Sequence, residues 1–340
     1  MVAPSCFFKI LYDFVSYLWA MIVVTGAAGF IGSALIGILL ERGYGQIIAV
    51  DDFSDILKHK NLEHKRLYAK IERKIFFEWL ESNIDEIQVI LHIGARTNTA
   101  EKSQEVLDEL NIEFSKRTWD WCIKGNIPFL YASSAATYGS GAQGFNDEDS
   151  IDQLEPLNLY GQSKHTFDMW VQKQSTTPPF WAGFKFFNVF GPNEYHKDRM
   201  ASVIMHAFNQ ISATGKMKLF QSHRSEYLNG EQKRDFIYIK DLIDVLLFFM
   251  ESRKNSGLYN LGTGKARTFK DLALSVFKAL EISPKIEYIP IPEDIREAYQ
   301  YFTEASMVKL KKAGYKGEFT PLEEGTKDYV NSYLKEKAYI

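Results

Sequence analysis

Cysteine is scarce in this chain of 340 residues, which contains only Cys6 and Cys122. Two thiols so far apart are too few for a disulfide framework or for a metal site built from thiolates. The seven histidines show no HExxH or similar spacing, so we expect no metal site. The low cysteine content fits a reducing cytoplasm, which is the location that we expect.

An excess of charge of one sign is also missing, because 40 Lys and Arg residues face 43 Asp and Glu residues. The net charge of −3 gives no reason to expect nucleic acid or a membrane as a partner. The first twenty residues are aromatic and apolar, but Lys9 and Asp13 interrupt them, and their uncharged runs are too short to span a bilayer. A signal peptide would need a positive charge before Lys9. We interpret residues 1–20 as an extension or an upstream start codon.

From Met21 onward, short apolar runs alternate with segments of helical period. The apolar runs are MIVVTG (21–26), QIIAVDD (46–52), VILHIGA (89–95), IPFLYASS (127–134) and WAGFKFFNVFG (181–191). FIGSALIGILLERG places Ile31, Leu35 and Ile38 on one helical face, and Gly43 marks its end. Residues 53–84 are charged and helical in part. Strands that are apolar on both faces, alternating with helices, predict an α/β fold with a doubly wound parallel sheet of the Rossmann type.

The composition and the regularity of the sequence change after Pro192. Residues 193–235 and 285–320 are less regular and richer in charge, whereas GLYNLGTG (257–264) returns to strand and turn. We therefore predict an NAD(P)-binding Rossmann core at 21–190. Residues 191–340 should form mainly a smaller mixed α/β substrate-binding domain, with 236–264 returning to the core.

A glycine motif follows the first strand. TGAAGFIG contains Gly26, Gly29 and Gly32 and opens the predicted helix. Glycines at such a turn let the backbone approach a pyrophosphate, whose charge then lies at the helix N-terminus. The pattern therefore predicts a dinucleotide site.

Acidic residues end the second strand about twenty residues further on, as the dinucleotide motif requires. Asp51 should accept hydrogen bonds from the adenosine ribose, which favours NAD, with Asp52 beside it. A 2′-phosphate would need compensating cations, and Lys58 and Arg73 are available, although either could be an ordinary surface charge.

Tyr160 and Lys164 are spaced by one helical turn in LNLYGQSKH (157–165). A lysine ammonium nearby favours the phenolate of a tyrosine, whose usual pKa of ~10 is too high for a base near neutrality. Ser134, at the end of another strand, should face the same crevice and hydrogen-bond a substrate hydroxyl. Tyr333 and Lys337 have the same spacing but no accompanying motif.

Together these stretches resemble the extended short-chain dehydrogenase/reductase superfamily, from Met21 nearly to the end. They resemble most closely one family, the ADP-L-glycero-D-manno-heptose 6-epimerases. The stretches that carry the resemblance are IPFLYASSAATYG, PLNLYGQSK, FNVFGPNEYHKDRMASV, KRDFIYIKD and YNLGTGKA. The third is the most discriminating, because HKDRMAS is not a general feature of the superfamily.

The resemblance implies an enzyme of lipopolysaccharide inner-core precursor synthesis that inverts C6 of the heptose in an ADP-sugar. Its implied cofactor is tightly held NADP, with NAD tolerated, which overrides the preference for NAD suggested by Asp51. The implied assembly is a homo-oligomer, typically a pentamer.

The resemblance also assigns roles to individual residues. The implied catalytic residues are Tyr160, Lys164, Lys197 and Ser134. The cofactor positions are Gly26, Gly29, Phe30, Ile31, Gly32, Asp51, Asp52, Lys58, Ile93, Gly94, Ala95, Asn111, Lys164, Val189 and Lys197. The substrate positions are Asn188, Arg199, His206, Phe220, Gln221, Ser222, His223, Arg234 and Tyr299. By itself, Lys197 would be read as a surface lysine, and Arg234 as the partner of Asp235 or Asp241.

Three departures from the family pattern put the shape of the sugar pocket in doubt. They are Arg96, Arg199 and the insertion HRSEYLNGEQK (223–233). Other functions remain as alternatives: a nucleotide-sugar 4,6-dehydratase, another epimerase or reductase, or a non-catalytic nucleotide-binding protein. Dehydration normally needs an acid and a base after the serine, where this chain has Ala135 and Ala136.

Overall fold

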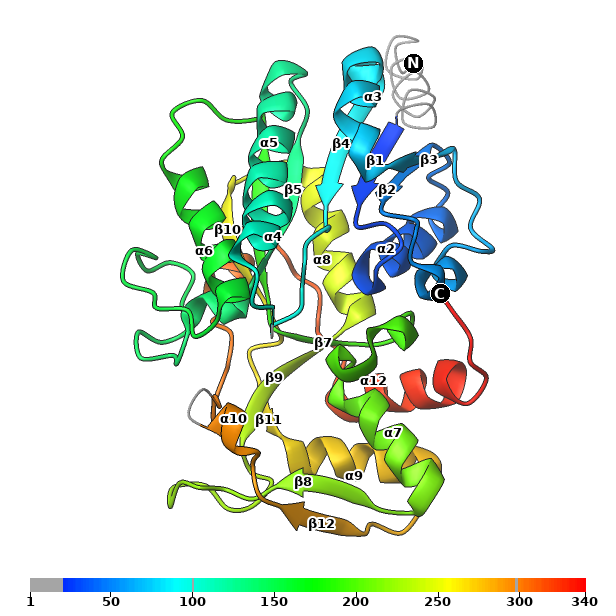
Figure 1. The fold of residues 1–340 in the computed structure, drawn as a ribbon, viewed down its shortest axis with the longest axis vertical. Helices are drawn as coiled ribbons and strands as arrows, with labels where there is room; N and C mark the ends of the chain where they lie inside the picture. The colour runs from blue at the N-terminus through cyan, green and yellow to red at the C-terminus, as the bar shows by residue number, and fades with distance from the viewer. Residues whose placement is uncertain (1–20, 100, 297–298) are drawn as a thin grey trace, which may run out of the picture.

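Seven parallel strands form the centre of the fold in a computed structural model that describes residues 21–99, 101–296 and 299–340 (Figure 1). Residues 1–20, interpreted above as an extension, lie outside this range. The strand order is β10-β6-β5-β4-β1-β2-β3. The strands are β1 (Met21–Thr25), β2 (Ile47–Asp51), β3 (Ala69–Glu72), β4 (Ile87–His92), β5 (Phe129–Ser134), β6 (Trp181–Phe186) and β10 (Gly257–Leu261). The predicted doubly wound parallel sheet is confirmed.

Helices cover both faces of this sheet because the central strands are apolar on both sides. One face carries α2 (Phe30–Glu41) and α8 (Ile239–Ser252), which contact each other. The other carries α3 (Phe76–Asn83), α4 (Gln104–Leu107), the π-helical turn η4 (Asp108–Glu113), α5 (Phe114–Lys124) and α6 (Leu159–Gln172). Short 3₁₀ helices complete this part: η1 (Ile56–Asn61), η2 (Arg73–Ile75), η3 (Ile84–Glu86) and η5 (Ala135–Tyr138).

The charged segment 53–84 contains more than the helix that its composition indicates. Strand β3 pairs in parallel with β2 at the edge of the sheet, and its residues alternate between partly buried and exposed. An edge strand with one solvated face tolerates charged side chains, so the apolar signal used to find the other strands is absent from it. Residues 193–235 likewise contain a regular helix, α7 (Val203–Thr214).

The smaller part of the molecule is built on two short sheets. One has the order β11-β9-β7, with β7 (Asn188–Phe190) parallel and β11 (Ala266–Thr268) antiparallel to β9 (Lys233–Tyr238). The other pairs β8 (Met217–Phe220) with β12 (Ile286–Ile289). The remaining helices are η6 (Tyr195–Met200), α9 (Phe269–Leu280), α10 (Glu293–Arg296), α11 (Val308–Lys312), α12 (Leu322–Asp328) and η7 (Tyr329–Leu334).

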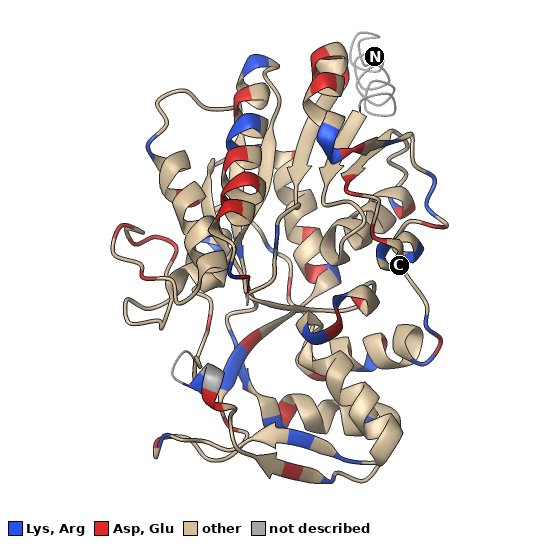
Figure 2. Ribbon diagram, viewed as in Figure 1, with Lys and Arg blue, Asp and Glu red and all other residues tan. Residues whose placement is uncertain are grey.

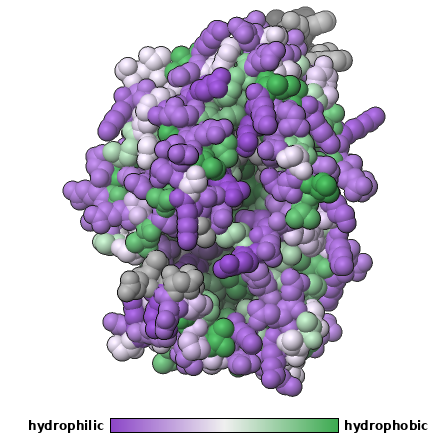
Figure 3. Space-filling model, in the orientation of Figure 1, coloured by the Kyte–Doolittle hydropathy of each residue, from purple (hydrophilic) through white to green (hydrophobic). Residues whose placement is uncertain are grey.

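The chain passes between the two parts more than once. Only Phe187 separates β6 of the large sheet from β7 of the small one, and the chain later returns to the large sheet at β10. The molecular surface is hollowed between the two parts (Figure 3). Acidic and basic residues are interspersed along the same elements, as Figure 2 shows for α5. The carboxyl ends of the parallel strands point toward the smaller part (Figure 1). Ligands of such folds bind at these strand ends.

Candidate active site

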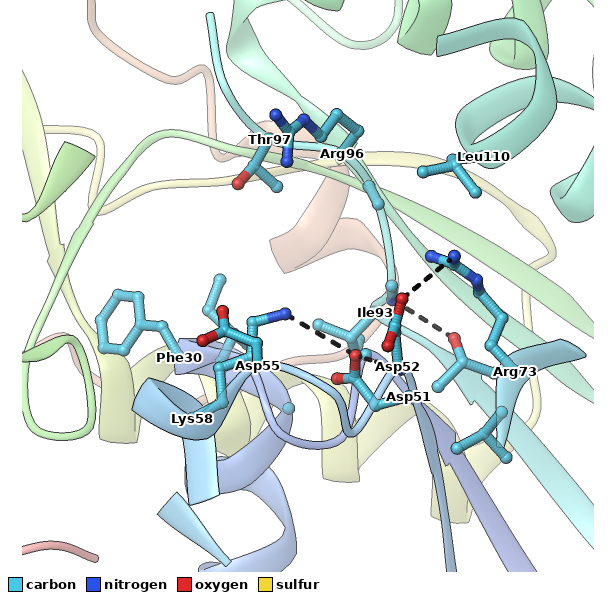
Figure 4. A pocket seen from close by; sticks show the side chains of 18 of the residues that line it. Phe30, Asp51, Asp52, Asp55, Lys58, Arg73, Ile93, Arg96, Thr97 and Leu110 are labelled. Atoms are coloured by element: carbon cyan, nitrogen blue, oxygen red, sulfur yellow. Dashed lines mark hydrogen bonds and ion pairs between the residues drawn. The ribbon is translucent and has the colours of Figure 1, made fainter. Parts of the chain in front are cut away.

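A cavity of about 520 Å³ lies at the carboxyl ends of β1, β2 and β4 (Figure 4). Twelve of the predicted cofactor residues line it: Gly26, Gly29, Phe30, Ile31, Gly32, Asp51, Asp52, Lys58, Ile93, Gly94, Ala95 and Lys197. Residues that were not assigned to the site also line it, among them Thr25, Asp55, His92, Arg96, Thr97, His196 and Met200. The structure thus brings loops from distant parts of the chain around one cavity.

The glycine loop is packed too closely to carry side chains at two positions. A Cβ on Gly26, whose φ is +66°, would lie 2.5 Å from Cα of Gly94, and one on Gly32 would lie 2.1 Å from O of Gly26. Helix α2 begins at Phe30, so Gly32 lies in its first turn, which has no acidic residue. Its free N–H groups and its dipole therefore face the cavity without competition from a carboxylate, which suits a pyrophosphate.

Two ion pairs lie at the predicted adenosine end of the cavity. Nζ of Lys58 is 3.7 Å from Oδ1 of Asp51, and Nη2 of Arg73 is 3.5 Å from Oδ2 of Asp52. Asp51 also accepts hydrogen bonds from N of Ala28 (2.9 Å) and N of Asp52 (2.7 Å). Figure 4 shows these four charged side chains opposite Arg96 and Thr97. The two carboxylates are thus partly neutralised inside the cavity.

A buried histidine holds the loop that follows β4. His92 lies between Oγ1 of Thr25 (2.7 Å) and Oγ of Ser115 (2.9 Å), and burial lowers its pKa to about 3. The same Thr25 oxygen accepts a hydrogen bond from N of Gly94 (3.2 Å). A neutral imidazole therefore connects the end of β1 to the cofactor loop. Its place at the end of a buried strand, within HIGA, was the available sequence signal.

Asn111 supports this loop from behind and does not line the cavity. Its Oδ1 accepts from N of Arg96 (2.7 Å), and its Nδ2 donates to O of Arg96 (3.0 Å) and Oγ of Ser163 (2.9 Å). Val189, in β7, is half-buried and also lies outside the cavity lining. The structure therefore gives Asn111 a supporting position between the loop and α6.

Helix α6 places Tyr160 and Lys164 one turn apart, as their spacing predicts. The helix starts where Oδ1 of Asn158 accepts from N of Gly161 (2.8 Å). Burial raises the pKa of the Tyr160 phenol, and its side-chain hydrogen bond with Ser134 acts in the opposite direction. Ser134 ends β5, so strand and helix bring these two hydroxyls together.

Lys164 is almost completely buried. Its Nζ donates to O of Ala132 (2.8 Å), and burial lowers its pKa to about 8, an effect that the charge of Asp168 partly opposes. The Lys164 charge in turn contributes to the low pKa of His92, which lines the cavity. The second Tyr-x-x-x-Lys lacks such a setting, because η7 ends at Leu334, before Lys337.

Lys197 reaches the cavity from a different element, η6. Its Nζ lies 5.3 Å from the centre of the Phe30 ring, and its N donates to O of Glu194 (2.9 Å). Burial lowers the pKa of Lys197, and the buried carboxylate of Glu194 opposes this. The backbone turns sharply at the next residue, Asp198, where φ is +44°. Burial also lowers the pKa of the neighbouring His196 to about 4, which leaves it neutral near pH 7.

Arg234 is a buried cation that has no acidic partner among the described residues. Only 7% of its surface is exposed, and its guanidinium donates to O of Lys233 and O of Gln300. The expected partners are engaged elsewhere, because Asp235 binds the turn at 263–264 and Asp241 binds residue 320. Such a guanidinium suits an anionic ligand with several oxygens.

The predicted substrate residues fall into two groups. Phe220 and Tyr299 are in ring contact (5.9 Å between centres), and Tyr299 also lies 5.4 Å from the Arg234 guanidinium. Gln221, Ser222 and His223 continue from Phe220 into the insertion, which packs on Tyr301. Asn188 and Arg199 are exposed and lie apart on β7 and η6, and His206 contacts O of Arg199.

Two other functional features are absent from residues 21–99, 101–296 and 299–340. No helix in these ranges is both long enough and apolar enough to cross a membrane. Within the same ranges, no three His, Cys, Asp or Glu side chains are grouped so that they could hold a metal ion.

Comparison with known proteins places this arrangement in a family. Residues 22–262 match the NAD dependent epimerase/dehydratase family. A protein of *Fusobacterium nucleatum* named ADP-L-glycero-D-manno-heptose-6-epimerase is 44% identical over 94% of this chain and 100% of its own length. One of *Nitratidesulfovibrio vulgaris* with the same name is 44% identical over 92% of this chain and 98% of its own.

Solved structures agree with the sequence comparison. The crystal structure of *Helicobacter pylori* ADP-L-glycero-D-manno-heptose-6-epimerase has a TM-score of 0.78 and 25% identity, over 93% of this chain and 97% of that one. A *Bacillus cereus* UDP-glucuronic acid 4-epimerase in complex with NAD has a TM-score of 0.75 at 23% identity, over 94% of this chain and 100% of that one, and shows the same fold. The chain therefore belongs to the NAD-dependent epimerase/dehydratase family and, within it, to the ADP-L-glycero-D-manno-heptose-6-epimerases.

Proposed function

We propose that this chain converts ADP-D-glycero-D-manno-heptose to ADP-L-glycero-D-manno-heptose, a step in the synthesis of lipopolysaccharide inner-core precursors. The identity of 44% to full-length relatives with this activity in their names carries the proposal. The geometry supports it, because Lys197 lines the dinucleotide cavity and a hydrogen bond joins Ser134 to Tyr160, although these two side chains do not line the cavity themselves. Inversion at C6 proceeds through a 6-keto sugar, which is then reduced on its other face.

The residues of the cavity fit a nicotinamide dinucleotide. The glycine loop leaves no room for a Cβ, and the first turn of α2 offers free N–H groups to a pyrophosphate. When bound, the cofactor supplies the hydride acceptor for the oxidation and the hydride donor for the reduction. Ser134 then holds the C6 hydroxyl by a hydrogen bond, and Tyr160 takes its proton. Lys164, one helical turn away, would favour the phenolate through its charge, against the burial that raises the pKa of Tyr160.

Two proton-transfer groups explain how both faces of the ketone are served. One group cannot easily remain within hydrogen-bond reach of the oxygen in both orientations of the sugar. Tyr160 belongs to α6 and Lys197 to η6, and Lys197 lines the cavity beside Phe30. We assign Tyr160 to one orientation and Lys197 to the other. The lowered pKa of Lys197 makes proton exchange easier near neutral pH.

The smaller part, within residues 191–340, is proposed to bind the nucleotide sugar. Arg234 supplies for the diphosphate a buried guanidinium that has no acidic partner among the described residues, and Tyr299 and Phe220 offer aromatic surface beside it. Asn188, Arg199 and His206 are assigned to the sugar by family resemblance alone. The proposed core is residues 21–190 together with the returning segment 236–264, although β7 and the end of β9 within these bounds pair in the small sheet.

We propose NADP as the natural cofactor, with NAD as a weaker alternative. Lys58 and Arg73 bring two cations to the adenosine end, where a 2′-phosphate would lie. Each already faces a carboxylate, so each cation can offset the repulsion between that carboxylate and a phosphate. Isothermal titration of apo-protein tests this: Lys58→Ala and Arg73→Ala should weaken NADP binding by about tenfold and leave NAD binding within threefold. Equal losses for both cofactors would contradict the assignment.

The test of the function is conversion without added reductant. Purified protein is mixed with ADP-D-glycero-D-manno-heptose, and NMR follows the configuration at C6. We expect an equilibrium mixture without net accumulation of reduced cofactor. Tyr160→Phe and Lys197→Met should each slow conversion by 100-fold or more while cofactor binding persists. Bound cofactor without any conversion would leave the fold assignment intact and reject the substrate.

The family resemblance also supports a cytoplasmic location and a homo-oligomer, with a pentamer as the expected size. Light scattering coupled to size-exclusion chromatography measures the assembly. A mass corresponding to a single chain would reject it.

A further inference from the structure

A fully buried ion pair lies beneath the proposed catalytic helix. Asp168 follows Lys164 by one turn of α6, and its Oδ2 lies 2.8 Å from Nζ of Lys185 in β6. Neither side chain has any exposed surface. Removing two charges from water is costly, and an apolar pair of similar volume is often as stable or more so. Stability alone is therefore a weak explanation for this pair.

Hydrogen bonds occupy both members of the pair. Oδ1 of Asp168 accepts from the hydroxyl of Tyr131 (3.0 Å), and Oδ2 accepts from Oγ of Ser133 (2.7 Å). Nζ of Lys185 also donates to Oγ1 of Thr137 (2.7 Å). The pair thus joins four elements, β5, β6, α6 and η5, into one polar network with fixed geometry.

This network connects the two halves of the proposed catalytic group. Oγ1 of Thr137 donates to O of Ser134 (2.8 Å), so one end of the network holds the turn that presents Ser134. The other end is α6, which carries Tyr160 and Lys164. We propose that the Asp168–Lys185 pair is a positioning element that fixes the Ser134 turn against α6. The proposal rests on the function proposed above.

The charge of Asp168 also acts on the titrating groups around it. On α6 it counteracts the effect of burial on the pKa of Lys164. The other titratable groups near the pair are Tyr131 on β5, Tyr138 on η5, Tyr160 and His165 on α6 and Lys309 on α11, with His92 on β4 beyond Lys164. Removal of the Asp168 charge should therefore lower the pKa of Lys164 further.

The decisive variant removes both charges together. In Asp168→Asn/Lys185→Met no unpaired charge remains buried, so the fold should survive. We expect kcat for epimerisation to fall 10- to 100-fold, with KM and the cofactor Kd within threefold of the wild type. The alkaline limb of the kcat profile should move to lower pH, because Lys164 loses its nearby negative charge. Wild-type kcat and an unchanged profile would overturn the proposal.

A control uses a half-exposed pair of the same two residue types that lies outside this network. Nζ of Lys240 lies 2.8 Å from Oδ2 of Asp328, and this pair joins α8 to α12. Asp328→Asn/Lys240→Met should leave kcat and its pH profile unchanged. If the first double variant does not fold, Thr137→Val carries the test, because it cuts the link to Ser134 and keeps both charges. Lowered kcat at constant KM is then expected, and wild-type kcat would count against the proposal.

A readout without substrate separates this inference from the proposed function. Lysines labelled with ¹³C at Cε are titrated by NMR, and the Lys164 signal is assigned from its loss in Lys164→Arg. The double variant should shift the Lys164 titration to lower pH. If the wild type fails to convert the ADP-sugar, only the proposed function is rejected. An unchanged Lys164 titration rejects the electrostatic role of the pair whatever the substrate.

Discussion

Replacing Lys164 by methionine should abolish activity and yet stabilise the folded protein. Burial lowers the pKa of Lys164 from its ordinary 10.5 to about 8. One pKa unit is worth about 1.4 kcal/mol, so the folded state carries a penalty of roughly 3 kcal/mol at neutral pH for holding this ammonium. Methionine has a similar length and no charge, which removes the penalty without opening a large cavity.

The lost hydrogen bond reduces the gain. Nζ of Lys164 donates to O of Ala132 at 2.8 Å, and removing such a bond costs about 1 kcal/mol. The net expectation is that the free energy of unfolding at pH 7 rises by about 2 kcal/mol. This is the reverse of the usual effect of substituting a buried, hydrogen-bonded side chain.

The pH dependence gives the sign of the effect. Below about pH 8, Lys164 is protonated in the folded and unfolded states, and the penalty is fully present. Between about pH 8 and 10.5 the unfolded state binds more protons, so rising pH favours the folded wild type and relieves the penalty. The advantage of Lys164→Met over the wild type should therefore shrink across this window.

Urea unfolding of apo-protein, followed by circular dichroism at pH 7, 8, 9 and 10, measures this difference. The exposed Lys70→Met on β3 serves as the control and should stay within about 0.5 kcal/mol of the wild type. The reasoning would be refuted by a Lys164→Met protein that is less stable at pH 7, or by an advantage that persists unchanged to pH 10.

Three further outcomes follow from the structure. Gly32→Ala should lose about 1–3 kcal/mol of stability and bind cofactor at least tenfold more weakly, because the new Cβ would lie 2.1 Å from O of Gly26. Thermal unfolding and titration calorimetry measure these two effects. Gly45→Ala is the neutral control, because a Cβ at Gly45 would meet nothing within 4 Å. Arg234→Met should raise KM for the ADP-sugar 10- to 100-fold in steady-state assays and leave cofactor affinity unchanged, since the guanidinium lies away from the dinucleotide cavity. Burial lowers the pKa of His92 to about 3 in the folded protein. As pH falls below 6.5, the unfolded state therefore binds a proton that the folded state does not bind, and the protein loses stability. In urea titrations, His92→Gln should lose less stability between pH 6.5 and 5 than the wild type does.

Local patterns were enough to predict most of the large sheet and the glycine loop. The apolar runs that form β1, β2, β4, β5 and β6 bury both faces, so composition alone reveals them. Helix α2 follows from its period and from Gly43. Strand β3 could not be found in this way. It lies at the edge of the sheet, where its side chains alternate between partly buried and exposed, so they form no apolar run.

In the candidate site, too, residues that are close in sequence could be predicted, whereas those brought together by tertiary packing could not. The glycine loop and the Tyr160–Lys164 turn are contiguous in sequence, so their spacing was readable. His196 reaches the cavity through the tertiary packing of η6, which leaves no local spacing to detect, whereas the end of a buried strand pointed to His92. The Asp168–Lys185 pair depends on how α6 lies against β6, and nothing in either segment specifies its partner. The sequence offered Asp235 and Asp241 as partners for Arg234, so it gave no sign that this arginine lacks an acidic partner among the described residues.

The strand order of the large sheet has a consequence for biosynthesis. β10 pairs with β6, Gly257 opposite Ala182, but the ribosome must first make the residues of β7, β8 and β9. At about 5–20 residues per second, the outer edge of β6 waits several seconds for its partner. During that time an apolar strand exposes unpaired backbone groups, which is the condition that favours wrong pairing. The soluble yield on overexpression should therefore depend most on temperature and chaperone supply while residues 187–256 are being translated. Synonymous codons that speed translation of these residues should raise the soluble yield.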